Sequence, residues 1–307
     1  MKTYIFLVIF VVNSALVFGQ NQRIYEMSKW EIDSLLTVKS TENLNITERM
    51  KFYSQLFMGM PYGLTCVGDG PYALYDTQPQ LTLDTTNCMV YCEDVLALSI
   101  SDNYENFFNN LQHIRYKDGV IGMKTRNHYT MADWLPENSW LLHDVAKEVA
   151  GDKAKTITRT ISHKKFFSKK GIDDMRYVKD DRTITVNYIP FNVLINVKEN
   201  FRSGDILALL FKNLDNIFSA HMLMAYDTPT GKVIRESSLS KATVLDTTYD
   251  EWVENYQNSK KYIGIALMRV NDNINTPGSI IVPWEIKKLK MEDNKELYGL
   301  YSTKAGT

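Results

Sequence analysis

The sequence has few cysteines and almost no excess charge. Its 307 residues include three Cys, 8 Pro and 15 Gly, and the formal net charge at pH 7 is −1. Proteins that bind nucleic acid or anionic membranes need clustered Lys and Arg side chains, and this composition offers no such excess. We therefore expect no nucleic-acid partner. With 44% hydrophobic residues, the chain can form a substantial core in one large domain or two modest ones.

The sequence also lacks the common metal-binding patterns. It contains no Cys-x-x-Cys and no His-Glu-x-x-His, so we predict no metal site and no cofactor. The three cysteines, Cys66, Cys88 and Cys92, cannot all pair within one chain. Cys88 and Cys92 are four residues apart, a spacing that a regular helix bridges poorly with a disulfide. At least one free thiol is therefore expected.

The N-terminus carries an apolar run from Tyr4 to Phe18, preceded by Lys2. This run has the length of a signal-peptide core and is short for a membrane span. We predict a signal peptide over residues 1–19, with cleavage near Gly19; an uncleaved anchor is the alternative. The mature chain would then be exported to the periplasm or beyond, without stable insertion in a membrane.

The hydrophobic period changes from that of helices to that of strands along the chain. Helical patterns cover residues 25–40, 47–60, 88–101 and 103–116, and an irregular aromatic segment leads to another helix that Gly151 ends. Short segments rich in β-branched residues follow, with one late helix at 246–259; the predicted strands are 156–162, 183–190, 205–211, 220–227, 232–238 and 262–270. Helices first and strands afterwards predict an α+β fold.

A Gly- and Pro-rich stretch at 61–76 interrupts the helical half and predicts a loop. It contains Gly68-Asp-Gly70-Pro-Tyr-Ala73, which loosely matches a dinucleotide-binding pattern. Pro71 lies inside the pattern and no βαβ unit surrounds it, so we set the nucleotide interpretation aside.

Cys88 is the best candidate for a nucleophile. It begins an apolar helical pattern directly after capping residues at 84–87, and a helix N-terminus lowers a thiol pKa. Cys92 lies one turn deeper, where that effect fades. The plainer alternative for Cys88 is a small buried hydrophobic residue.

His221 is the best candidate for a base, because it opens an apolar strand that follows a likely strand and turn. Glu236 lies on the following strand and could face His221 across an antiparallel pair. A Cys on a helix, a His on a strand and a polar residue on the next strand follow the order of a papain-like site.

The chain resembles the N-acetylmuramoyl-L-alanine amidase-like family, a branch of the NlpC-type papain-like cell-wall hydrolases. The resemblance covers roughly residues 58–270 and rests on "PYG" at 61–63, "NCMVYCEDVLALS" at 87–99, "IRYKDGVIGMKTRNHYTMADW" at 114–134, "YIP" at 188–190, "GDI" at 204–206 and the His221 strand.

This resemblance implies a papain-like fold, with Cys88 in a helical N-terminal half and His221 in an antiparallel β half. Cys88 would be the nucleophile, His221 the base and Glu236 the orienting group. The implied activity is hydrolysis of the N-acetylmuramoyl-L-alanine amide bond in peptidoglycan fragments. The implied domain spans residues 61–272, with a helical extension at 20–60 before it and an extension at 273–307 after it.

Three residues depart from the family pattern: Asn87 replaces Asp, Val90 replaces Thr, and Glu236 replaces His. Two alternatives therefore stay open. One is a γ-D-glutamyl-diaminopimelate peptidase of the same fold, and the other is a muropeptide-binding module without turnover.

The resemblance also suggests four substrate-binding residues. Tyr62 would lie near the scissile amide, Arg126 and His128 would meet substrate carboxylates, and Trp134 would stack on a sugar. Three of them have a specific structural alternative: Tyr62 could pack the loop, Arg126 could pair with Glu93, and Trp134 could belong to the core.

Overall fold

The computed structural model of the chain describes residues 22–302, with side chains described through residue 293. The predicted signal peptide at residues 1–19 lies outside the described residues. Within 22–302, no helix combines the length and the apolar character that crossing a bilayer requires.

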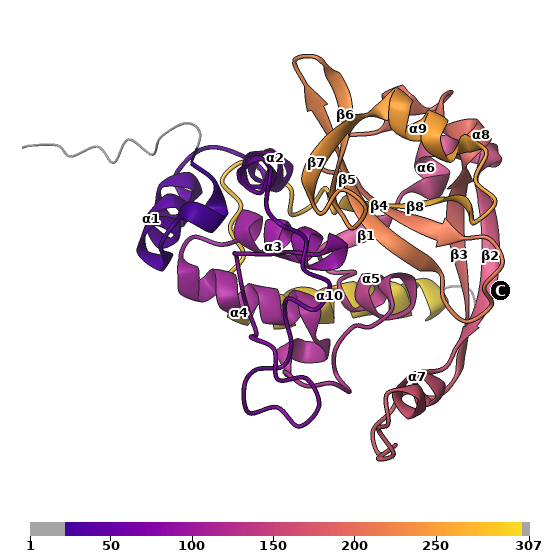
Figure 1. Cartoon of the computed structure of the whole chain (residues 1–307), viewed down its shortest axis with the longest axis horizontal. Coiled ribbons are helices and arrows are strands. Elements are labelled where there is room, and N and C mark those ends of the chain that lie inside the picture. The colour runs from indigo at the N-terminus through magenta and orange to yellow at the C-terminus, as the bar shows by residue number, and fades with distance from the viewer. Residues whose placement is uncertain (1–21, 303–307) are drawn as a thin grey trace, which may run out of the picture.

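The N-terminal half is helical, as its period predicts (Figure 1). Asn45 caps the second helix with its side chain, and Glu48 closes the capping box from the other side. These elements are η1 (Ile24–Glu26), α1 (Lys29–Ser40), α2 (Ile46–Leu56), α3 (Cys88–Ile100) and α4 (Tyr104–Arg115).

Short irregular elements connect this half to the sheet. Gly151 ends α6 with φ 54°, a left-handed conformation that suits glycine, and so confirms the predicted helix end. The connecting elements are η2 (Lys117–Gly119), η3 (Thr130–Trp134), α5 (Leu135–Glu137), β1 (Leu142–Asp144), α6 (Ala146–Ala150) and η4 (Gly151–Lys153).

The C-terminal half forms one antiparallel sheet in the order β2-β3-β8-β4-β5-β6-β7, with β1 paired to β8. Its strands are β1 together with β2 (Lys155–Ile161), β3 (Arg182–Pro190), β4 (Ile206–Phe211), β5 (Ser219–Thr228), β6 (Gly231–Ser238), β7 (Thr243–Thr248) and β8 (Tyr262–Val270). The helices between and after them are α7 (His163–Lys169), α8 (Phe191–Leu194), η5 (Lys198–Asn200), α9 (Tyr249–Gln257) and α10 (Pro283–Ser302).

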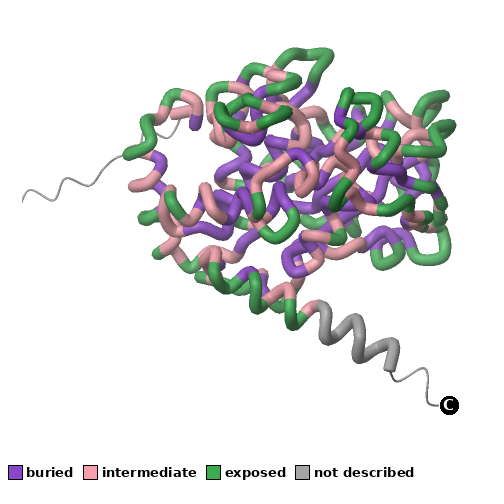
Figure 2. Tube along the Cα trace, turned by 90° about the horizontal axis from the view of Figure 1, so that it is seen from below, coloured by how far each residue is buried: buried purple, intermediate pink, exposed green. Residues whose placement is uncertain are grey.

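Each face of the sheet has its own buried cluster. Side chains alternate along β5, so Met222 and Met224 join the cluster that contains α3, whereas Leu223 and Ala225 join the cluster under α9. Figure 1 shows α3 and α9 on opposite sides of the sheet, and Figure 2 shows the buried segments running through the middle of the molecule. The sheet is thus covered on both faces. Cys88 at the start of α3 belongs to the helical half, and His221 on β5 and Glu236 on β6 belong to the sheet.

All six predicted strands are present, but the sequence did not predict β7, β1, α7 or α10. The late helix expected at 246–259 begins only at Tyr249, because the residues before it belong to β7. β7 is an edge strand in which only Val244 is fully buried, so its sequence lacks the apolar alternation that reveals a strand. β1 has three residues, too few to show a period.

Candidate active site

Cys88 is the first residue of α3. The side chain of Asn87 caps this helix by accepting hydrogen bonds from Met89 N at 3.1 Å and Val90 N at 3.0 Å. The replacement of the family's Asp by Asn therefore keeps the cap. Because Cys88 is the first helical residue, its own N–H has no acceptor inside the helix and is available to a ligand.

The structure brings Cys88, His221 and Glu236 together. The His221 imidazole on β5 and the Cys88 thiol lie close enough to shift each other's pKa values, downward for the thiol and upward for the imidazole. Nε2 of the same ring lies 2.5 Å from Oε2 of Glu236 on β6. Since a carboxylate only accepts, Nε2 carries the proton, and Nδ1 is the ring nitrogen left for the thiol.

Glu236 reaches His221 diagonally across two paired strands. The register of β5 and β6 pairs Met224 with Arg235, so continuing it by one position sets Glu236 opposite Leu223, two residues from His221. Diagonal neighbours on antiparallel strands are within reach of long side chains.

The thiol of Cys88 has a lowered pKa. Burial alone would raise it, but the hydrogen bond and charge of His221 outweigh burial, and the backbone N–H groups of Met222 and Met89 add to the lowering. The other two thiols behave oppositely: burial raises the pKa of Cys66 to about 11 and raises that of Cys92 well above its usual value. All three cysteines lie in the described part of the chain, and none forms a disulfide.

The imidazole of His221 has a raised pKa of about 9. Burial lowers the pKa, but the hydrogen bonds and charges of Cys88 and Glu236 raise it by more. A lowered thiol pKa beside a raised imidazole pKa favours a thiolate–imidazolium pair near neutral pH.

Tyr62 lies beside this pair. Burial raises its pKa first, and the charges of Cys88 and Cys66 raise it further. Its backbone bridges Thr86, the carbonyl of which also accepts a hydrogen bond from Ser237 Oγ at 3.2 Å. The loop that carries Tyr62 is therefore tied to both the helix start and β6.

Arg126 binds two carboxylates of the loop before α3. Its guanidinium lies 2.9 Å from Asp69 and 3.0 Å from Asp76. The alternative pairing with Glu93 is wrong, because Glu93 binds Arg115 at 2.8 Å in the core. Arg126 thus holds the loop in place, and its charge is already matched within the protein.

His128 and Trp134 have surroundings unlike those of substrate-binding groups. Burial lowers the pKa of His128 to about 4, so the ring is neutral at neutral pH and does not meet a carboxylate as a cation. Its Nε2 lies 2.7 Å from the Met123 carbonyl. Trp134 is 0% exposed and belongs to the core, so no ring face is open to a sugar.

Sequence reasoning missed two groups at the site. The backbone N–H of Met222 helps to lower the pKa of the Cys88 thiol, and no side-chain pattern reports a backbone donor. The second group is Tyr256 on α9. Burial, and next the nearby charge of Glu236, raise the pKa of the Tyr256 phenol to about 12. Its position at the end of a predicted helix gave no hint of this contact.

Over the part of the chain that the structure describes, no three His, Cys, Asp or Glu side chains gather as a metal-binding group.

Three solved structures share this fold. A Legionella pneumophila protein is 22% identical, with a TM-score of 0.73, over 83% of this chain and 96% of its own. An N-acetylmuramoyl-L-alanine amidase from Bacteroides uniformis is 22% identical, with a TM-score of 0.60, over 74% and 99%. A Bacteroides fragilis protein provisionally described as a xylanase is 22% identical, with a TM-score of 0.56, over 70% and 98%. These likenesses show the fold.

A search among curated proteins found no significant match. The family model described as N-acetylmuramoyl-L-alanine amidase-like matches residues 52–263, which is more than half of the chain and includes Cys88, His221 and Glu236. This chain belongs to the N-acetylmuramoyl-L-alanine amidase-like family.

Proposed function

We propose that the protein is an exported cysteine amidase that hydrolyses the bond between N-acetylmuramic acid and L-alanine in peptidoglycan fragments. Family membership supports the reaction class. The observation that supports the catalytic assignment is that, of the three thiols, only Cys88 has a lowered pKa, and the imidazole that lowers it has its Nε2 2.5 Å from the Glu236 carboxylate.

Cys88 would act as the nucleophile in two steps. Its thiolate attacks the lactyl carbonyl carbon, and the His221 imidazolium gives its proton to the leaving L-alanine nitrogen as the amide C–N bond breaks. The product is a muramoyl thioester on Cys88. Water then attacks the thioester while neutral His221 takes a proton from it, and the sulfur leaves as thiolate, which restores the starting pair.

Two groups would assist this chemistry without changing bonds. The free N–H of Cys88 at the start of α3 can stabilise the oxyanion of each tetrahedral intermediate. Glu236 keeps the imidazole oriented through Nε2 and stabilises its positive charge.

A polysaccharide hydrolase fits this site less well than an amidase does. Most glycoside hydrolases need two carboxyl groups on either side of the scissile bond, one as acid and one as base or nucleophile. Here a single carboxylate, Glu236, is bound to His221 beside a thiol. The set of groups is that of acyl transfer.

Mass spectrometry of muropeptides would test the reaction. N-acetylmuramoyl-L-alanyl-D-isoglutamine would be incubated in heavy-oxygen water with wild-type protein, Cys88→Ala and Cys92→Ala. We expect wild type and Cys92→Ala to release the dipeptide and place one heavy oxygen in the lactyl carboxylate, and Cys88→Ala to do neither. Cys92 is the matched control because it lies on the same helix and is buried.

Other outcomes would replace the proposal. Cleavage after D-glutamate in a longer stem peptide would mean a γ-D-glutamyl-diaminopimelate peptidase. Binding without any cleavage by wild type would mean a muropeptide-binding module. Cleavage by Cys88→Ala would remove Cys88 from the nucleophile role.

Export needs its own measurement. The apolar run before Gly19 supports a cleaved signal peptide. N-terminal sequencing of the protein recovered outside the cytoplasm should begin at or near Gln20. Recovery with Met1 intact would contradict cleavage and favour an anchor.

A further inference from the structure

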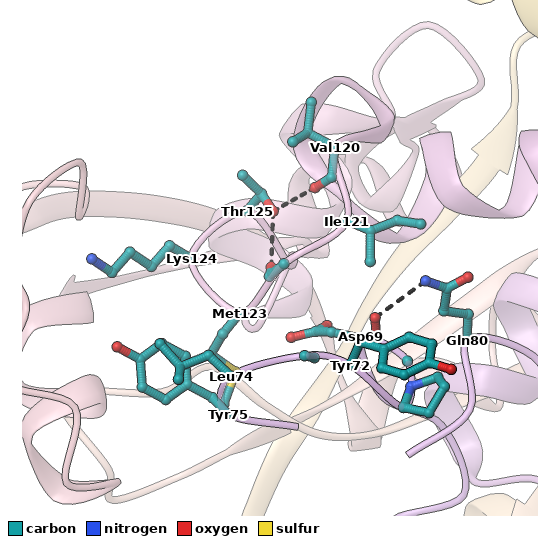
Figure 3. A pocket seen from close by; sticks show the side chains of 14 residues that line it. Asp69, Tyr72, Leu74, Tyr75, Gln80, Val120, Ile121, Met123, Lys124 and Thr125 are labelled. Atoms are coloured by element: carbon teal, nitrogen blue, oxygen red, sulfur yellow. Dashed lines mark hydrogen bonds between the residues drawn. The ribbon is translucent and has the colours of Figure 1, made fainter. Parts of the chain in front are cut away.

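One hollow of the molecule is not lined by the Cys88 side chain. It has a volume of about 540 Å³, a size suited to a small ligand, and its walls come from the loop segment 69–80 and the segment 120–125 (Figure 3). Neither Cys88, His221 nor Glu236 lines it. The proposed hydrolysis therefore leaves this pocket without a role.

The wall formed by the loop is held in one shape by backbone hydrogen bonds. The amide of Gly68 donates to Pro79 O at 2.8 Å, and the amide of Gly70 donates to Gln78 O at 2.9 Å. Gly70 has φ 101°, a conformation that other residues rarely adopt. The glycines that loosely resembled a nucleotide motif thus shape a pocket wall.

Apolar and aromatic side chains stand exposed around the hollow. Tyr72 is 99% exposed and Tyr75 is 41% exposed, and Leu74 and Val120 are exposed beside them. Large exposed apolar groups gathered at one place usually mark a binding surface. Tyrosine rings combine a flat apolar face with a polar tip, which suits a ligand with apolar faces and hydroxyl groups.

The charged side chains of the walls are already paired. Asp69 binds Arg126 at 2.9 Å and accepts from the Tyr116 hydroxyl at 2.9 Å. Lys124 binds Asp174 at 3.0 Å and points away from the other lining side chains (Figure 3). The pocket therefore offers no uncompensated charge from these two residues, and charge complementarity favours a neutral ligand over a carboxylate-rich peptide.

Polar groups in the pocket can orient such a ligand. The Gln80 amide nitrogen donates to Asp69 O at 3.2 Å, which fixes this side chain (Figure 3). The amide oxygen of Gln80 can accept a hydrogen bond. The hydroxyl groups of Tyr72 and Tyr75 can donate or accept. A few placed polar groups among apolar walls are typical of small-molecule sites.

The pocket and Cys88 share one loop. Its ends meet at the start of α3, where Gly63 N donates to Thr86 O at 2.9 Å and the Asn87 amide donates to Leu64 O at 3.2 Å. The pocket wall is a later part of this loop.

We propose that this pocket is an accessory subsite for a neutral N-acetylated hexosamine of the glycan strand to which the scissile muramoyl group belongs. The assignment to a glycan strand rests on the proposed function, whereas the binding of the sugar to the pocket does not. The sugar would stack a face on Tyr72 or Tyr75 and hydrogen-bond to Gln80. A stem peptide from a neighbouring strand is the competing occupant.

Binding of a chitin tetrasaccharide to Cys88→Ala protein would test the subsite by calorimetry. This ligand carries neither a lactyl group nor a peptide, so its binding does not depend on amidase activity. We expect saturable binding that weakens at least about tenfold when Tyr72→Ala and Tyr75→Ala are combined, because each ring supplies apolar contact area. Trp284→Ala, which removes another exposed aromatic ring, is the matched control and should bind as before.

Kinetics would then separate the subsite from the proposed function. The double Tyr variant should cleave a single-sugar muramoyl dipeptide as wild type does, but lose about tenfold in kcat/KM on glycan-bearing substrates, through KM. Absence of cleavage by wild type would overturn the amidase proposal and leave the binding result standing. No tetrasaccharide binding, equal binding by the double variant, or binding of a free stem peptide in its place would overturn the subsite.

Discussion

Two histidines of this protein are each bound to a carboxylate, but the two pairs differ in their exposure and in the groups beside them. His221 Nε2 lies 2.5 Å from Glu236, and the side chains are 16% and 12% exposed. His163 Nε2 lies 2.7 Å from Asp133, and the side chains are 3% and 0% exposed. The two pairs are alike in geometry and differ in what surrounds them.

The third group decides what each pair can do. Beside His221 is the Cys88 thiol, and the imidazole lowers the pKa of that thiol. Beside Asp133 are Lys179 at 2.9 Å and Arg182 at 2.7 Å. His163, followed by Lys179, holds the pKa of the Asp133 carboxyl well below its usual range despite burial. We therefore expect a catalytic role for the His221 pair, which has a thiol beside it, and a structural role for the buried His163 pair.

Replacing each histidine by Ala should separate the two roles most clearly. His221→Ala should lower kcat/KM by about 10³-fold, because general acid–base catalysis typically contributes 10² to 10⁴. His163→Ala should keep most activity in the folded fraction, since Asp133 retains two cations. Iodoacetamide labelling of Cys88 near pH 7 is the second readout, and it should slow only in His221→Ala. Equal slowing in both variants would contradict the distinction.

Replacing the two carboxylates should also have different effects: the change at Glu236 should lower activity, and the change at Asp133 should lower stability. Glu236→Gln should lower kcat/KM by about 10²-fold, because the imidazole loses its counter-charge. Asp133→Asn should instead lower the free energy of unfolding by about 3 kcal/mol, because it leaves Lys179 and Arg182 without their anion. Urea unfolding followed by circular dichroism measures the second effect. A fully stable Asp133→Asn protein would show that the cluster contributes no net stability.

The pH profile should reflect the His221–Cys88 pair. The thiolate–imidazolium form exists above the lowered pKa of Cys88 and below the raised pKa of His221, so kcat/KM should fall as pH rises through about 9. Glu236 is one of the groups that raise the His221 pKa, and Glu236→Gln should move this alkaline limb to lower pH. An alkaline limb that the substitution does not move would argue that another group controls it.

Tyr62→Phe should have the smallest effect. The phenol lies near Cys88, so losing one hydrogen bond to substrate should lower kcat/KM by about fivefold. Tyr53→Phe is a control with a buried ring in the core and should leave kcat/KM unchanged. No change in Tyr62→Phe would assign Tyr62 to loop packing.

Much of the framework near Cys88 could be predicted from the sequence because it depends on local chemistry. Asn87 caps the helix that Cys88 begins, and six strands follow from runs of β-branched residues. Glu236 was expected to face His221 from the next strand, and the structure brings these side chains into contact.

The sequence could not predict contacts that depend on distant segments. Arg126 binds Asp69 and Asp76, which are more than 40 residues away, and no local pattern reports which carboxylates a guanidinium will meet. Trp134 is buried because η3 packs into the core, a consequence of tertiary packing. The residues that bind a substrate are harder to predict than those that begin a helix.

The position of β8 has a consequence for how the molecule assembles. This last strand, Tyr262–Val270, lies between β3 and β4 and is the element through which β2 and β3 join the strands that carry His221 and Glu236. At Gly264 on β8 an added side-chain carbon would lie 2.2 Å from Ile189 O on β3, so the two paired strands approach too closely there for any other residue. A ribosome must therefore make almost the whole chain before the sheet can close, and a chain cut short before residue 262 would leave two unjoined groups of strands with open edges.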